Sequence, residues 1–208
     1  MLNDRNHIII IYKMSKRLCF VYTETNGLHN SDSNCDVNKK KLYCYARLVS
    51  LNYEIGVFKN NEFILEKKMR QIVKPRCMVI PPETVEYHGI TQEYACVNGV
   101  DPEQVIATFK ADIKNVDIII SHSVDFHFKT ILAEALKYNI AIDFNNYVVI
   151  DTISFYHSYG FLKLKELAMK LHIKDIKESN DSNVQLIKNV FFKLYVKYEK
   201  SLDKSETA

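Results

Sequence analysis

The pattern of apolar and polar positions predicts strands in the first half of the chain. Residues 18–23 (LCFVYT) and 46–58 are rich in β-branched and aromatic side chains, which is typical of strands. The polar triplet at 59–61 (KNN) predicts a hairpin turn, with a partner strand over 62–68. Few apolar residues occur at 29–41, so this stretch is predicted to be a loop.

The second half of the chain alternates helical periodicity with short apolar runs. Amphipathic helices are predicted over 101–114, 125–138, 163–171 and 184–198, and buried strands over 116–121 and 147–150. The prolines within 73–91 predict irregular structure there. Antiparallel strands followed by alternating helices and strands indicate an α/β fold, with a mixed sheet of about five strands and helices on both faces.

These elements indicate one domain, over residues 16–199, preceded by a leader at 1–15 and followed by a disordered tail at 200–208. Because 47% of the residues are hydrophobic and 25% charged, the chain can bury a core, which excludes disorder of the whole.

Five cysteines without C-x-x-C spacing favour reduced thiols over a disulfide framework or a zinc site. The apolar run at 8–12 is far shorter than the roughly 20 residues that span a bilayer. We therefore expect an intracellular, cytoplasmic protein without a membrane anchor.

The abundance of Lys, Asn, Ile and Tyr indicates AT-rich coding DNA, a bias of many large DNA viruses and some parasites. A viral source would place the protein in the host cytoplasm or the virion.

Net charge is +3, which is too small to predict a polyanionic partner by itself. The candidate phosphate contacts are therefore short basic runs, which a solvated surface explains equally well. They are Lys39, Lys40, Lys41, Lys67, Lys68 and Arg70.

Four segments carry candidate chemistry at or near the predicted strand ends, where ligands of such folds bind. They are 22–28 (YTETNGL), 86–91 (EYHGIT), 121–127 (SHSVDFH), and a last one that begins at 149–152 (VIDT) and ends at 180–185 (NDSNVQ). In this order they resemble the DEDDh 3′–5′ exonucleases, whose corresponding motifs read D-x-E-T-x-G-L, H-G-I-T, H-N-x-x-F-D and H-x-A-x-x-D. The resemblance implies the ribonuclease H-like fold.

In that family four carboxylates hold two Mg²⁺ ions and a histidine acts as general base. The resemblance places the four acid positions at Tyr22, Glu24, His127 and Gln185, and the base at Asn180. It also places His88 near the nucleic-acid groove. One carboxylate of four is kept, so we expect no metal cofactor, with Mg²⁺ or Mn²⁺ required only if activity is retained.

Displaced acids provide an alternative to this loss of function. Asp125 lies two residues before His127, and Asp181 lies one after Asn180, but on a helix these offsets turn a side chain away by about 200° and 100°. A metal site formed by Glu24, His122 and His127 has no diagnostic spacing.

For several of these residues, a structural role explains the sequence as well as a catalytic or metal-binding role does. Glu24 is predicted to accept hydrogen bonds from turn amides or His127, and Asp151 to accept backbone amides. His122 is expected to be a structural residue at a strand end, and Thr91 to cap a helix.

The leading hypothesis is a catalytically inactive exonuclease-like domain that acts in structure, assembly or nucleic-acid association. A protein assembly is the expected partner and nucleic acid the second one. The alternatives are an active, metal-dependent exonuclease that uses Glu24 with Asp125 or Asp181, and a regulatory subunit of a polymerase or nuclease.

Overall fold

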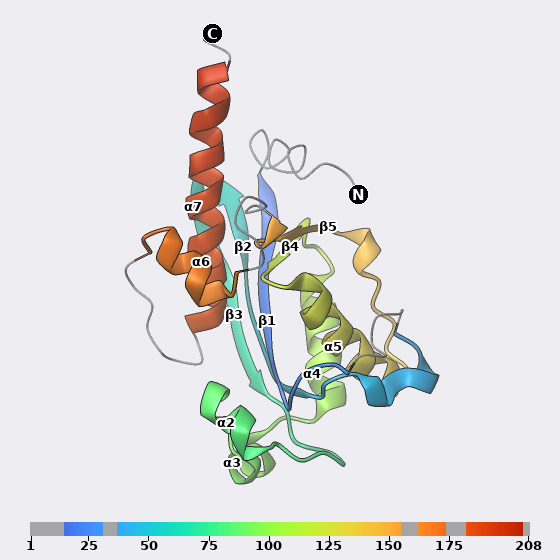
Figure 1. The fold of residues 1–208 in the computed structure, drawn as a ribbon. Coiled ribbons are helices and arrows are strands. Elements are labelled where there is room, and N and C mark those ends of the chain that lie inside the picture. Colours follow the sequence, from blue (N-terminus) through green and yellow to red (C-terminus); the bar gives the residue numbers. More distant parts are fainter. Residues whose placement is uncertain (1–14, 31–36, 155–161, 174–181, 206–208) are drawn as a thin grey trace.

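The computed structural model describes residues 15–30, 37–154, 162–173 and 182–205 (Figure 1). The predicted leader, apart from residue 15, lies outside these residues, as do the general-base position Asn180 and the displaced acid Asp181. Among the described helices, none has the length and apolar character needed to cross a bilayer.

A mixed five-stranded sheet forms the centre of the protein, as the sequence predicted. Its strands are β1 (Lys16–Thr25), β2 (Leu48–Lys59), β3 (Glu62–Ile72), β4 (Ile118–Ser121) and β5 (Val148–Asp151). Their order is β3-β2-β1-β4-β5; β1, β2 and β3 pair antiparallel, whereas β1, β4 and β5 pair parallel. Parallel pairing places the carboxyl ends of β1, β4 and β5 at one edge of the sheet.

The hairpin between β2 and β3 turns at the predicted place. Asn60 and Asn61 both have positive φ angles (54° and 61°), which matches the two-residue type I′ turn that asparagine tolerates. β3 continues to Ile72, beyond the predicted end at residue 68, because it pairs with β2 along nearly its whole length.

The helices fall into the predicted order with two differences. They are α2 (Pro82–His88), α3 (Gln92–Asn98), α4 (Pro102–Ile113), α5 (Val124–Lys137), α6 (Leu164–Lys170) and α7 (Ser182–Ser205), with 3-10 turns η2 (Lys39–Cys44) and η3 (Phe144–Asn146). The prediction of irregular structure over 73–91 was wrong for α2, since proline suits the first turn of a helix. α7 continues through Ser205, into the segment that was predicted to be a disordered tail.

Two apolar layers enclose the sheet. Leu18 and Phe20 of β1 pack beneath α6 and α7, whereas Cys19 and Val21 face α4 and α5. Figure 1 shows α6 and α7 on one side of the sheet and α4 and α5 on the other. Because side chains alternate along a strand, Tyr22 and Glu24 continue the α7-facing row to the end of β1.

A smaller apolar cluster lies at one end of the sheet. It joins Val49 of β2 to Ile80, Ile90 and Ala95 around α2 and α3. Thr91 caps α3 as expected, because its Oγ1 accepts a hydrogen bond from the backbone N–H of Tyr94 (3.1 Å).

Candidate functional site

Glu24, the one acid kept from the family pattern, lies at the end of β1 and is 8% exposed. Its Oε1 accepts a hydrogen bond from the side-chain amide of Asn183, near the start of α7 (3.1 Å). The prediction that turn amides or His127 would satisfy Glu24 therefore differs from the structure. The partner comes instead from a helix 159 residues further along the chain.

Burial makes Glu24 a weaker acid than an exposed glutamate. It raises the pKa of the Glu24 carboxyl from 4.5 to about 7, although the Asn183 hydrogen bond and the positive charge of Arg70 act in the opposite direction. About half of the molecules thus carry a neutral carboxylic acid here near pH 7. A carboxyl group that holds its proton is a poor ligand for a hard divalent cation.

His127 occupies the third acid position and is fully enclosed at 3% exposure. Its Nδ1 lies 2.7 Å from Oγ1 of Thr23 and accepts a hydrogen bond from the backbone N–H of Thr23 (3.2 Å). Burial lowers the pKa of His127 to about 3, against the effect of a hydrogen bond with the backbone of His122. The imidazole is therefore neutral at physiological pH, and Nδ1 is committed to Thr23.

Tyr22 occupies the first acid position and packs against His127, with ring centroids 4.5 Å apart. Burial, followed by the charge of Glu24, raises the pKa of its phenol above the ordinary value of 10.0. Tyr22 therefore stays neutral and fills space where the resemblance would require a carboxylate.

The fourth acid position is where spacing and structure disagree. Gln185 is exposed, and its amide donates a hydrogen bond to Asn189 within the same helix (2.8 Å), so it does not face Glu24. Asn183 takes that place. The spacing of residues in α7 could have indicated that Asn183 faces the site. Asn183 precedes the fully buried Ile187 by one helical turn, so both lie on the same face of the helix.

The displaced acid Asp125 does not approach Glu24. Its side chain is 80% exposed and pairs with Lys129 one turn along α5 (2.9 Å). Within the described residues, no group of three or more His, Cys, Asp or Glu side chains is placed to hold a metal ion. The donors around Glu24 thus do not fit a pair of Mg²⁺ ions, which need several charged oxygen ligands.

His122 and Asp151 lie nearby but have structural partners. The ring nitrogens of His122 contact Oγ1 of Thr152 (2.8 Å) and the carbonyl of Leu162 (2.9 Å). The Asp151 carboxylate accepts the backbone N–H groups of Ser123, Val124 and Ile153, which fixes the start of α5. Both arrangements agree with the structural roles expected from the sequence.

His88 is 2% exposed, and its Nδ1 accepts a hydrogen bond from the backbone N–H of Ile90 (3.0 Å). The side chain supports the turn between α2 and α3 and lies beside the backbone of Thr25 at the end of β1. Its place near a nucleic-acid groove stays a prediction.

The basic residues predicted on β3 are largely paired within the protein. Lys67 pairs with Asp112 (2.6 Å) and Lys68 approaches Glu54 (3.7 Å). Arg70 lies on the Glu24 side of the sheet and acts on that carboxyl through its charge. A cavity of about 10 Å³ separates this row from α7, room for about one water molecule.

The basic run on η2 lies away from this row. Lys39 bonds to the side chain of Asn139 (2.8 Å), and Lys40 is exposed.

Comparisons with known proteins identify the fold. The sequence matches no protein-family profile and no curated protein sequence. Its structure is similar to *E. coli* exonuclease I solved with a dT13 oligonucleotide, with a TM-score of 0.69 and 12% identity over 91% of this chain. Exonuclease I from *Methylocaldum szegediense* gives a TM-score of 0.63 and 15% identity over 86% of this chain.

At these identities the comparison shows the fold alone: the protein has an α/β, ribonuclease H-like exonuclease fold. The chain spans less than half the length of these exonucleases, 43% and 40% respectively.

Proposed function

We propose that this protein is a catalytically inactive exonuclease-like domain that acts by binding and not by hydrolysis. One observation carries the proposal: the single acid of the site, Glu24, faces an amide, and the positions beside it hold a phenol and a buried imidazole. Two-metal hydrolysis needs concentrated negative charge that these groups do not supply.

Polar groups at this site already form hydrogen bonds with one another, which supports the proposal that the domain is inactive. Asn183 donates to Glu24, and Thr23 contacts His127. A ligand would have to break these bonds in a region of low dielectric, which is costly. The retained fold thus serves as a scaffold.

Nucleic acid is the partner that we favour for this scaffold. Two of the similar structures are complexes of E. coli exonuclease I with dT13 oligonucleotides, and the described part of this chain has a cationic pocket at the carboxyl end of β1. A protein assembly is the second candidate. It is favoured by exposed apolar side chains around α2 and α3, where Tyr87 is 88% and Val97 is 81% exposed.

Thermal unfolding with and without Mn²⁺ tests the loss of the metal site. A cation that binds the folded state raises the Tm of the protein. The proposal therefore predicts the same Tm with Mn²⁺ and in buffer without divalent cations. An increase that disappears in Glu24→Ala and persists in the exposed control Glu86→Ala would show a working metal site and contradict the proposal.

Fluorescence anisotropy with a labelled single-stranded oligonucleotide distinguishes the two partners. Binding that weakens steeply as salt increases indicates phosphate contacts and supports the nucleic-acid role. The absence of binding in low salt excludes that role and leaves the protein assembly.

A further inference from the structure

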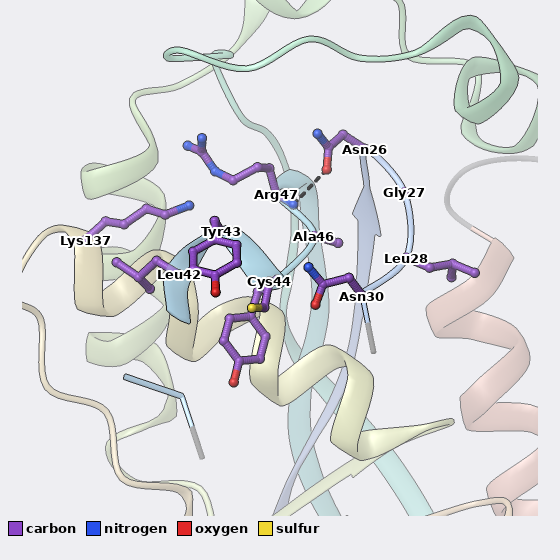
Figure 2. Close-up of a pocket in the computed structure, with 11 residues that line it drawn as sticks. Asn26, Gly27, Leu28, Asn30, Leu42, Tyr43, Cys44, Ala46, Arg47 and Lys137 are labelled. Carbon is purple, nitrogen blue, oxygen red and sulfur yellow. Dashed lines mark hydrogen bonds between the residues drawn. The ribbon is translucent and has the colours of Figure 1, made fainter. Parts of the chain in front are cut away.

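An open pocket of about 460 Å³ lies at the carboxyl end of β1 (Figure 2). Three segments form it: the loop at 26–30, the end of η2 with the residues up to Arg47, and Lys137 in the last turn of α5. This volume falls within the range of small-molecule sites, whereas an inorganic ion would fill only part of it.

Among the described residues that line the pocket, two are cationic, Arg47 and Lys137, and none is acidic. Arg47 and Lys137 both donate to one oxygen of Glu134, whose side chain lies behind them and is 1% exposed. The distances to Glu134 Oε1 are 2.6 Å from Arg47 Nε and 3.1 Å from Lys137 Nζ. Within this cluster of three residues, two positive charges face one negative charge.

Both cations keep donors for a ligand. Arg47 has five N–H groups, of which one binds Glu134 and another contacts the carbonyl of Arg76 (3.3 Å). Lys137 has three N–H groups and uses one for Glu134. Burial lowers the pKa of Lys137, so an anion beside it would stabilise its charged form.

The loop at 26–30 is held in place before any ligand arrives. Oδ1 of Asn26 accepts the backbone N–H of Arg47 (2.8 Å), and the backbone N–H of Asn26 donates to the carbonyl of Arg47 (3.0 Å). Gly27 has a φ of 152°, and a Cβ added there would meet nothing within 4 Å. The positive φ favours glycine at this position, and Figure 2 shows the path of the loop around the pocket.

We propose that this pocket binds the phosphate group of a nucleotide, with Arg47 and Lys137 as the charged contacts. Arg47 supplies paired N–H donors and Lys137 a point charge, the combination that suits phosphate oxygens. Tyr43, which is 74% exposed, also lines the pocket. This assignment deepens the proposed nucleic-acid role, which the same pocket supports, and it does not depend on whether the Glu24 site hydrolyses nucleic acid.

The test is an amide NMR titration of the full chain with three probes: inorganic phosphate, thymidine monophosphate and a short oligothymidine. Sodium chloride at matched ionic strength is the control for general salt effects. Lys137→Gln is the main variant because it leaves the Arg47–Glu134 pair intact. Lys110→Gln, the same change at an exposed position on α4, is the matched control.

We expect the amides of residues 26–30 and of Arg47 to shift on adding phosphate or the nucleotide, with dissociation constants up to about 1 mM. Lys137→Gln should weaken this binding about tenfold, whereas Lys110→Gln should not change it. Arg47→Lys, which keeps a cation beside Glu134, should weaken it by a smaller factor.

Two outcomes identify the source of the phosphate. Tighter binding of the mononucleotide than of the oligonucleotide indicates a free nucleotide, and the reverse order indicates a polynucleotide backbone. Absence of shifts with all three probes, or shifts that persist unchanged in Lys137→Gln, would overturn the proposal. Loss of nuclease activity, or its presence, has no effect on this result, so the two proposals fail separately.

Discussion

Replacing Glu24 by glutamine should stabilise the protein at alkaline pH and leave its stability unchanged at acidic pH. Glutamine has the same shape as the protonated acid and keeps an oxygen that can accept the Asn183 hydrogen bond. It removes only the ionisation. The difference between the variant and the wild type thus isolates the free energy of burying the Glu24 charge.

The sign and size follow from the raised pKa of Glu24. The unfolded chain releases this proton near 4.5, and the folded protein keeps it until about pH 7. The neutral form therefore stabilises the fold fully below the unfolded pKa, and this contribution is lost as pH rises through the folded pKa. A shift from 4.5 to about 7 corresponds to about 3 kcal/mol, so Glu24→Gln should gain about 2–3 kcal/mol at high pH.

Urea unfolding followed by circular dichroism measures this difference at about pH 4 and pH 8.5, on either side of the titration. Glu86→Gln, an exposed site on α2, is the matched control and should match the wild type at both pH values. The reasoning would be refuted if Glu24→Gln changed the free energy of unfolding equally at the two pH values. It would also be refuted if the wild type were more stable than the variant at high pH. The latter result would mean that the site favours an ionised carboxylate.

Two further predictions concern other buried polar groups. Because burial lowers the pKa of His127 to about 3, its ring resonances in NMR spectra should stay constant between about pH 5 and 8; titration in that range would contradict its enclosure against Thr23. Lys188→Met should cost about 3 kcal/mol in urea unfolding, since Glu54 is 3% exposed and Lys188 Nζ lies 2.5 Å from it. A loss below about 1 kcal/mol would mean that Lys68 alone compensates the Glu54 charge.

The arrangement of strands and helices could be predicted from the sequence because each signal was local. Alternating residues in β1, the asparagine turn before β3 and the capped start of α4 each fix one element. α2 was missed because its paired prolines were interpreted only as helix breakers, whereas Pro82 lies in the first turn. Proline breaks a helix in its interior but is favoured in its first turn.

The candidate site was harder to predict because its contacts join distant segments. Motif spacing placed Gln185 at the fourth acid position, but the rotation of α7 brings Asn183 to Glu24. The pocket at Arg47 and Lys137 draws on three segments, and its two cations lie outside the motifs recognised in the sequence. Local patterns contain no information on which of these side chains will meet.

Incubation of the protein with 5′-labelled single-stranded DNA and RNA in Mg²⁺ or Mn²⁺ tests the central claim most directly. Products are resolved by denaturing electrophoresis, and Glu24→Ala and Glu86→Ala serve as the test and control variants. Our account predicts full-length substrate with all three proteins, because Glu24 is the only carboxylate among the four family acid positions. Metal-dependent shortening from the 3′ end by the wild type and Glu86→Ala, but not by Glu24→Ala, would contradict it.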